Sequence, residues 1–253
     1  MPAISKAAPV FSLDGRRALV TGASTGIGRA MAGALADAGA EVVLVARTRA
    51  DLGRAADEIG ERATWIAADV GQEAEIHRIC EHVGDVDILV NAAGVNLRPP
   101  MHELTTDDWA ITMAVNLTAP FLLGQCLAPG MVERGWGRIL HVGSQQSWRA
   151  FGNSGGYGAS KAGLLGLTRS QAEAWSPAGV TVNCVIPGFV RTAMTERIFV
   201  EEPERAEALA ARTMVGRNGT PEDFAGIAVF LCSDAAAFVT GQAIAVDGGF
   251  SAT

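Results

Sequence analysis

A serine, a tyrosine and a lysine stand close together in residues 143–161, whose sequence is GSQQSWRAFGNSGGYGASK. Tyr157 is the only tyrosine of the chain, and Lys161 follows it by four residues, a spacing that brings both side chains to one face of a helix. A phenol has a pKa near 10, and lowering it by about three units needs roughly 4 kcal/mol. A lysine ammonium about 4 Å away, at an effective dielectric constant of about 20, supplies close to that free energy. The pair therefore predicts a tyrosine that exchanges protons at neutral pH.

Ser144 precedes Tyr157 by thirteen residues and follows a predicted strand, 138–142. Its hydroxyl is placed to hydrogen-bond a substrate oxygen that gains or loses a proton. A tyrosine and a lysine four residues apart on a helix usually have only a structural role. The chemical interpretation therefore requires a cofactor site elsewhere in the chain.

A glycine-rich turn, TGASTGIG at 21–28, joins a predicted strand, 17–21, to a helix that begins near Ile27. Glycines at such a turn let the backbone approach a pyrophosphate, which then lies at the positive end of the helix. The spacing is not the GxGxxG form, and a structural turn is the alternative. The predicted phosphate-binding residues are Gly22, Ser24, Thr25, Gly26, Ile27 and Gly28.

Apolar strands and amphipathic helices alternate along the whole sequence. Strands are predicted at 17–21, 42–46, 64–67, 86–90, 138–142, 180–186 and 243–246, with helices between them. Parallel strands need crossover connections, so we expect one doubly wound Rossmann-type α/β domain over 1–253, with about seven parallel strands and helices on both faces. Residues 1–12 are expected to be a tail and 190–218 a substrate-lid insertion. Two helices are predicted at 106–115 and 117–133, the first capped by Thr105 with Asp108.

Composition narrows the range of partners. The 253 residues are 49% hydrophobic with net charge −7, which fits a single domain and disfavours nucleic acid and anionic membranes as partners. No basic segment precedes an apolar run near the start, and no stretch of about 18 apolar residues is evident, so a cytoplasmic protein is expected. The cysteines and histidines show no metal-ligand spacing. We expect Cys80, Cys126, Cys184 and Cys232 in the core, and His141 in a packed or capping role.

Several motifs occur together in the order typical of one enzyme family. TGASTGIG, NAAG at 91–94, the serine with YxxxK, and Pro187-Gly188 resemble the short, single-domain branch of the short-chain dehydrogenase/reductases over about residues 13–250. The resemblance implies a catalytic tetrad of Ser144, Tyr157, Lys161 and Asn116. Asn116 would hold a bend in its helix and a water that connects the lysine to solvent.

The same resemblance implies how a nicotinamide cofactor is held. Asp69 and Val70 would flank the adenine, although Asp69 can also cap the next helix. The residues expected to line the cofactor behind the fourth strand are Asn91, Ala92 and Gly94, and those expected around the nicotinamide carboxamide are Pro187, Gly188, Val190 and Thr192. Tyr157 would donate a proton to a carbonyl oxygen held by Ser144, while Lys161 holds the nicotinamide ribose.

The end of the second strand favours NADP(H). An acid there would bind the ribose 2′-hydroxyl of NAD, but the strand ends in Ala46, Arg47 and Thr48, and an arginine suits a 2′-phosphate. The family often has a second basic residue in the glycine turn, where this chain has Thr25. NAD(H) therefore stays the alternative.

The candidate substrate wall is more polar than a steroid or acyl-chain pocket needs, so a small polyol, sugar acid or hydroxy acid is expected. Its predicted members are Asn96, Arg98, Gln145, Gln146, Trp148, Arg149, Asn153, Phe189 and residues 194–199. Arg98 or Arg149 can pair with a carboxylate, unless both face solvent. The alternatives to an oxidoreductase are a nicotinamide-dependent epimerase or dehydratase and a catalytically silent nucleotide-sensing regulator. The ending GQAIAVDGGF resembles the part of the family that packs homotetramers.

Overall fold

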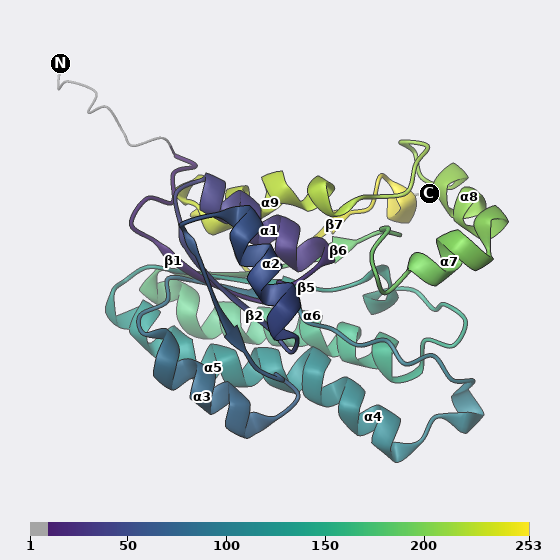
Figure 1. The fold of residues 1–253 in the computed structure, drawn as a ribbon, viewed down its shortest axis with the longest axis horizontal. Helices are drawn as coiled ribbons and strands as arrows, with labels where there is room; N and C mark the ends of the chain where they lie inside the picture. Colours follow the sequence, from purple (N-terminus) through teal and green to yellow (C-terminus); the bar gives the residue numbers. More distant parts are fainter. Residues whose placement is uncertain (1–9, 253) are drawn as a thin grey trace.

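A computed structural model describes residues 10–252 and shows a parallel sheet between two layers of helices (Figure 1). The strands are β1 (Arg17–Thr21), β2 (Glu41–Ala46), β3 (Ala63–Ala67), β4 (Ile88–Asn91), β5 (Gly137–Val142), β6 (Val180–Pro187) and β7 (Ala243–Val246). Their order across the sheet is β3-β2-β1-β4-β5-β6-β7, and every pairing is parallel. The predicted Rossmann-type fold is confirmed. Most of the predicted tail, residues 1–9, lies outside the described residues.

The helices fall into two groups that pack on opposite faces of the sheet. The helices are α1 (Gly26–Asp37), α2 (Arg49–Ile59), α3 (Glu73–Val83), α4 (Thr106–Met113), α5 (Ala119–Glu133), α6 (Gly155–Trp175), α7 (Glu196–Glu201), α8 (Pro203–Ala211) and α9 (Ala225–Cys232), of which α7 and α8 belong to neither group. Short 3₁₀ helices are η1 (Met101–Glu103), η3 (Gln145–Ser147), η4 (Ser176–Ala178), η5 (Pro221–Phe224), η6 (Asp234–Ala236) and η7 (Phe250–Ala252).

Two apolar cores hold these layers to the sheet. On one face Met31 of α1, Leu52 of α2 and Leu231 of α9 pack together, and on the other Ile76 of α3 and Leu123 of α5 do so. The central strands are buried along their length, whereas β3 and β7 at the edges are partly exposed. Near-continuous apolar strands therefore mark the centre of a parallel sheet covered on both sides.

The two helices predicted at 106–115 and 117–133 form one run. Between α4 and α5 the chain continues through a π-helical turn, η2 (Ala114–Thr118). The predicted cap is confirmed: the Thr105 hydroxyl accepts a hydrogen bond from Asp108 N at 3.0 Å, and Asp108 Oδ2 accepts one from Thr105 N at 3.2 Å. The whole run is long and apolar enough to cross a membrane by length and composition alone, unlike the sequence expectation. Leu123, Leu127 and Met131 on its inner face belong to the core.

Only part of the cysteine prediction holds. Cys184 and Cys232 are buried, but Cys80 is half-buried and Cys126 is exposed. Cys80 of α3 contacts Cys126 of α5, and burial together with this thiol contact raises the pKa of Cys80 to about 12. Apolar composition alone could not show that Cys126 lies on the outer face of its helix.

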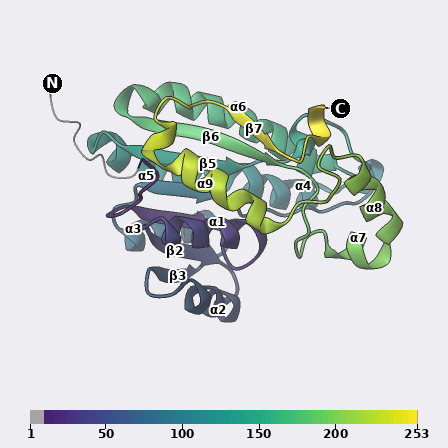
Figure 2. The same cartoon turned by 90° about the horizontal axis from the view of Figure 1, so that it is seen from above.

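The segment 190–218 contains α7 and α8, which stand apart from the two layers at one end of the sheet (Figure 2). Its ends are joined by an isolated parallel bridge between Val190 and Gly219. The charged middle predicted for this segment is present, since Arg197 pairs with Glu201, and Arg205 with Glu202. This placement puts two helices over the carboxyl ends of the strands.

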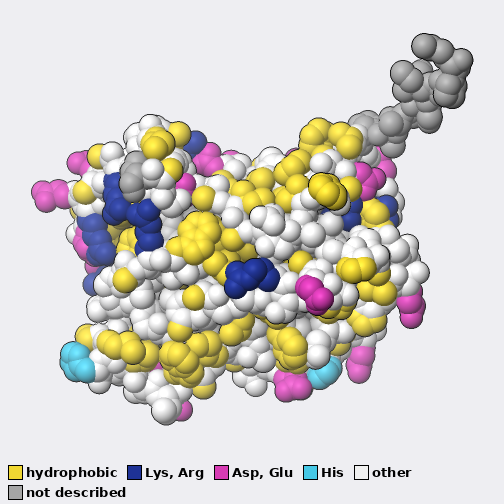
Figure 3. Space-filling model, turned by 180° about the vertical axis from the view of Figure 1, so that it is seen from behind, with side chains coloured by type: hydrophobic (Ala, Val, Ile, Leu, Met, Phe, Trp, Pro, Cys, Tyr) yellow, Lys and Arg dark blue, Asp and Glu magenta, His cyan; other side chains and the backbone are white. Residues whose placement is uncertain are grey.

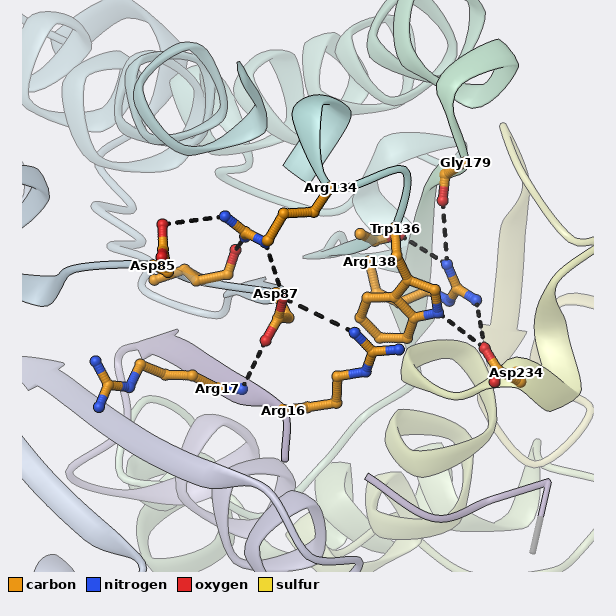
Figure 4. A network of polar contacts seen from close by, with 11 residues as sticks. Arg16, Arg17, Asp85, Asp87, Arg134, Trp136, Arg138, Gly179 and Asp234 are labelled. Carbon is orange, nitrogen blue, oxygen red and sulfur yellow. Dashed lines mark hydrogen bonds and ion pairs between the residues drawn. The ribbon is translucent and has the colours of Figure 1, made fainter. Parts of the chain in front are cut away.

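The amino ends of the strands carry a network of arginines and aspartates around Trp136 (Figure 4). Asp87 accepts a hydrogen bond from Arg17 N at 3.1 Å and lies 3.4 Å from Nε of Arg134. The guanidinium carbons of Arg16 and Arg138 lie 3.6 and 4.2 Å from the centre of the Trp136 ring. These contacts join the starts of β1, β4 and β5.

Arg138 is the buried member of this network. Its guanidinium donates to Ser233 O at 3.2 Å, to Gly137 O at 2.8 Å and to Asp234 Oδ1 at 3.2 Å. Burial lowers the pKa of Arg138, and Asp234 opposes that shift. A buried cation with this many partners ties the η6 region to the sheet.

We expect Arg138→Ala to lower the free energy of unfolding by about 3 kcal/mol, because it leaves buried carbonyls without donors and removes the cation from Trp136. Glu41→Ala is the matched control, since it removes an exposed ion pair with Arg17 and should cost less than about 1 kcal/mol. Urea unfolding of both variants measures the difference. Equal losses in the two variants would show that the Arg138 network adds nothing to stability.

Candidate active site

A cavity of about 620 Å³ opens at the carboxyl ends of β1 and β4. These neighbouring strands are where the order of the sheet reverses, the position at which open α/β sheets bind ligands. Nearly all the predicted site residues line it: Gly22, Ser24, Thr25, Gly26, Ile27, Gly28, Arg47, Asp69, Val70, Ala92, Gly94, Ser144, Tyr157, Lys161, Pro187, Gly188, Val190 and Thr192. The fold therefore gathers residues from seven separate segments around one space.

The glycine turn is built so that only glycine fits. Gly22 and Gly26 have φ of +64° and +59°, and a Cβ at Gly28 would lie 2.5 Å from Gly22 O. Thr25, the N-cap of α1, makes no side-chain capping bond, and the first turn of α1 holds no acid. The backbone N–H groups at this helix start thus face the cavity without an internal anion. A cradle of this kind fits a pyrophosphate.

Arg47 and Asp69 mark the other end of the cavity. Arg47 is exposed at the end of β2, as its prediction requires. Asp69 Oδ1 accepts a hydrogen bond from Gly71 N at 2.9 Å. The N-cap of α3 is Gln72, so Asp69 shapes the loop before the helix and does not cap it.

The predicted catalytic residues come together at the end of β5 and on α6. Ser144 has an extended backbone and its hydroxyl contacts the hydroxyl of Tyr157. Tyr157 and Lys161 are both buried on the same face of α6, as the four-residue spacing requires. Lys161 Nζ donates a hydrogen bond to Val142 O at 2.7 Å and lies 5.7 Å from the centre of the Tyr157 ring.

The electrostatics of the tyrosine differ from the sequence expectation. Burial raises the pKa of Tyr157, and the hydrogen bond with Ser144 only partly offsets that effect. Burial also lowers the pKa of Lys161 to about 8. The expected lowering of the Tyr157 pKa by a close lysine is therefore wrong for this arrangement, in which the Lys161 ammonium donates its hydrogen bond to the backbone carbonyl of Val142. Tyr157 is a protonated phenol at neutral pH.

Asn116 lies in the π-helical turn between α4 and α5, which is the irregular helix predicted for it. Its Oδ1 accepts from Val95 N at 2.9 Å, and its Nδ2 donates to Val95 O at 2.9 Å and to Ser160 Oγ at 3.0 Å. A Cβ at Gly94 would lie 3.5 Å from Asn116 Oδ1 and 3.7 Å from Lys161 Nζ. Asn116 thus fixes the loop after β4 beside the lysine.

Asn91, predicted as a cofactor contact, is not among the residues that line the cavity. Its Nδ2 donates to Nδ1 of His141 at 3.1 Å, and Nε2 of His141 donates to Gln171 Oε1 at 2.9 Å. Burial lowers the pKa of His141 to about 4, so the ring stays neutral at physiological pH. The packed role predicted for His141 is confirmed. The Asn91 side chain belongs to the buried hydrogen-bond series that runs from Asn91 through His141 to Gln171.

The substrate wall is partly as predicted. Asn96, Arg98, Gln145, Gln146 and Phe189 line the cavity, with Met194, Thr195 and Ile198 from the segment before and within α7. Trp148, Arg149 and Asn153 do not line it. Arg149 Nη2 instead donates to Ser251 O at 2.7 Å, so the guanidinium supports the C-terminal turn.

Phe151, Arg205 and Leu209 also line the cavity and were not predicted. Phe151 lies between Arg149 and Asn153, which were predicted for the wall. This position in the loop was the only feature of the sequence that pointed to Phe151. Arg205 and Leu209 are four residues apart on α8, a spacing that indicates one helix face. The sequence did not show that this face covers the cavity.

The arrangement resembles known proteins over nearly its whole length. A family model described as Enoyl-(Acyl carrier protein) reductase matches residues 22–251. Gluconate 5-dehydrogenase of Gluconobacter oxydans (strain 621H) is 41% identical over 249 residues, which are 96% of this chain and 97% of that protein. Galactitol 2-dehydrogenase (L-tagatose-forming) of Cereibacter sphaeroides is 41% identical over 253 residues, covering 96% and 97%.

A crystal structure from Beutenbergia cavernae is also similar to the chain. That protein is described as an NAD(P)-dependent gluconate 5-dehydrogenase with NADP bound at low occupancy, is 42% identical, and superposes with a TM-score of 0.92 over 96% of this chain and 100% of that one. These matches cover nearly the whole chain, whose cavity is lined by the glycine turn, Ser144, Tyr157 and Lys161. The chain therefore belongs to the short-chain dehydrogenase/reductase family of oxidoreductases.

Proposed function

We propose that the protein reversibly oxidises a secondary alcohol of a small polyol or sugar acid to a ketone with NADP(H). The observation that carries the proposal is that Ser144, Tyr157 and Lys161 meet at the wall of a cavity whose other end is a glycine cradle. The names of similar proteins, which act on gluconate and galactitol, support the substrate class.

The side chains of this site transfer the proton to and from the substrate oxygen. The nicotinamide, when bound, supplies or accepts the hydride. In the reductive direction Ser144 holds the carbonyl oxygen and Tyr157, whose phenol is protonated at neutral pH, donates the proton. In the oxidative direction Tyr157 must first lose its proton, which its environment opposes. Lys161 lies one turn along α6 and is placed to hold the ribose.

The polar groups of the wall suit a polyhydroxylated substrate. Asn96 Oδ1 is buried and has no hydrogen-bond partner among the described residues, so it can accept a hydrogen bond from a ligand hydroxyl. Arg98 and Arg205 line the same cavity and can pair with the carboxylate of a sugar acid. Arg205 also pairs with Glu202 at 2.8 Å, which keeps the net charge of this wall low.

The adenosine end favours NADP(H) over NAD(H). Arg47 lines the cavity at the end of β2, where a 2′-phosphate needs a cation, and the bound NADP of the B. cavernae structure supports this choice. Both cofactors share the glycine cradle, so the arginine decides between them.

We further propose a cytoplasmic homotetramer. Trp109, Ile111 and Phe121 are exposed on α4 and α5, and Phe238 is exposed in the loop before β7. Exposed apolar side chains on two separate surfaces support two kinds of subunit contact. A stable monomer in light scattering would contradict the tetramer.

Tyr157→Phe should reduce turnover to less than about 1% of wild type, because it removes the proton donor. The dissociation constant for NADPH, measured by fluorescence, should change less than about twofold. Assays with gluconate and galactitol follow reduced cofactor by absorbance. More than a few per cent residual activity would refute the role of Tyr157, and turnover without release of reduced cofactor would favour an epimerase.

The pH dependence should differ between the two directions. A raised Tyr157 pKa keeps the phenol protonated, so kcat/KM for alcohol oxidation should rise with pH from 7 to above 9, while kcat/KM for ketone reduction should not rise over that range. Initial rates in both directions at constant ionic strength test this. An oxidation rate independent of pH would contradict the assignment.

Arg47→Ala should lower kcat/KM for NADPH by at least about tenfold and leave kcat/KM for NADH within about twofold, because it removes only the partner of the 2′-phosphate. Arg49→Ala is the control, since Arg49 is exposed two residues further on and does not line the cavity. Equal losses with both cofactors, or wild-type preference for NADH, would refute the NADP(H) assignment.

A further inference from the structure

Gln145 stands beside Ser144 and is the most deeply buried polar residue of the substrate wall, at 4% exposure. Its Nε2 donates a hydrogen bond to Asp247 Oδ2 at 3.1 Å, across 102 residues of sequence. Asp247 follows the last residue of β7. The side chain next to the catalytic serine is therefore held by the C-terminal end of the chain.

The carboxylate of Asp247 is itself fixed. Its Oδ1 accepts from Gly249 N at 3.0 Å and its Oδ2 from Ser251 N at 2.9 Å. Burial raises the pKa of Asp247, but hydrogen bonds from Ser251 and Gln145 outweigh it and hold the pKa below its usual range. A Cβ at Gly188 would lie 2.8 Å from Asp247 Cα, so the turn after β6 also packs against this residue.

The C-terminal turn, residues 247–251, is supported by two other segments of the chain. Arg149 Nη2 donates to Ser251 O at 2.7 Å, and the ring of Phe151 lies 6.5 Å from the buried ring of Phe250. The guanidinium of Arg212, which follows α8, lies 4.2 Å from the centre of the Phe250 ring. Figure 3 shows basic side chains gathered at this end of the molecule. The position of Asp247 is thus set by contacts with the loop after Ser144 and with the end of α8.

A carboxylate only accepts hydrogen bonds, whereas an amide has one donor end and one acceptor end. Asp247 therefore requires the NH₂ group of Gln145 and directs Oε1 away from itself. We propose that Asp247 is a positioning residue that fixes the orientation of the Gln145 amide, so that Oε1 accepts a hydrogen bond from a substrate hydroxyl next to the reacting carbon. This inference rests on the proposed alcohol oxidation, since it places the substrate at Ser144.

The test compares oxidation of butane-2,3-diol and butan-2-ol with NADP⁺. Wild type should prefer the diol by about tenfold or more in kcat/KM, because only the diol has a neighbouring hydroxyl. In Asp247→Asn, whose amide allows Gln145 either orientation, the preference should fall to less than about threefold through a higher KM for the diol. Gln145→Leu should have the same effect. Asp37→Asn, an equal charge change at the exposed end of α1, should keep the wild-type preference.

A purely structural role would raise the KM of both alcohols together, and this result would overturn the proposal. So would an unchanged preference in Asp247→Asn. NADPH binding by fluorescence should be the same in all variants.

The contact can also be tested without turnover. Urea unfolding of wild type, Asp247→Asn, Gln145→Leu and the double variant forms a double-mutant cycle. We expect the free energy of unfolding of the double variant to be no lower than that of the less stable single variant. Strictly additive losses would overturn the contact. Failure of wild type to oxidise either alcohol would count against the proposed function, whereas this cycle would still decide on the Asp247–Gln145 bond.

Discussion

Burial of a phenol and an ammonium on one face of α6 is the constraint on which the site depends. Tyr157 and Lys161 have almost no exposed surface, and burial disfavours the charged form of each, raising one pKa and lowering the other. The fold stabilises them with few partners, Ser144 for the phenol and Val142 O for the ammonium. The result is a neutral tyrosine poised as a proton donor.

The two ends of the parallel sheet differ in the residues that they carry. At the amino ends, Trp136 and Arg138 make buried and partly buried polar contacts with Asp234, which join β5 to η6. At the carboxyl ends, glycines such as Gly22 and Gly94 remove side chains and leave room for a ligand. The polar contacts that join the strands therefore lie at the end of the sheet away from the cavity.

Much of the fold could be predicted from sequence because its signals are local. Buried strands read as continuous apolar runs, and the turn at 21–28 has glycines where φ is positive. The positions of Tyr157 and Lys161 followed from helical spacing alone. In the apolar pattern the π-helical turn at Asn116 appeared only as a boundary between two predicted helices, because a single extra residue in a turn leaves no pattern, and the bend was predicted from the family resemblance alone.

Other features could not be predicted because they depend on contacts between distant segments. Asn91 looked like a cofactor residue but bonds to His141 across the sheet. Arg149 looked like a carboxylate ligand but supports Ser251. The pKa of Tyr157 depends on its depth in the fold, whereas spacing suggested only that a lysine was near. Residue type and spacing therefore identify candidate site residues, whereas their burial and contacts in the fold determine what each side chain does.

Because Tyr157 is the only tyrosine of the chain, its ionisation can be followed directly. Titration of the wild-type protein by phenolate absorbance, with Tyr157→Phe as the blank, measures the one quantity on which the account of proton transfer rests. We expect a pKa above the ordinary value of about 10 in the free protein. A pKa well below that value would show that Lys161 already stabilises the phenolate and would contradict the assignment of a neutral proton donor.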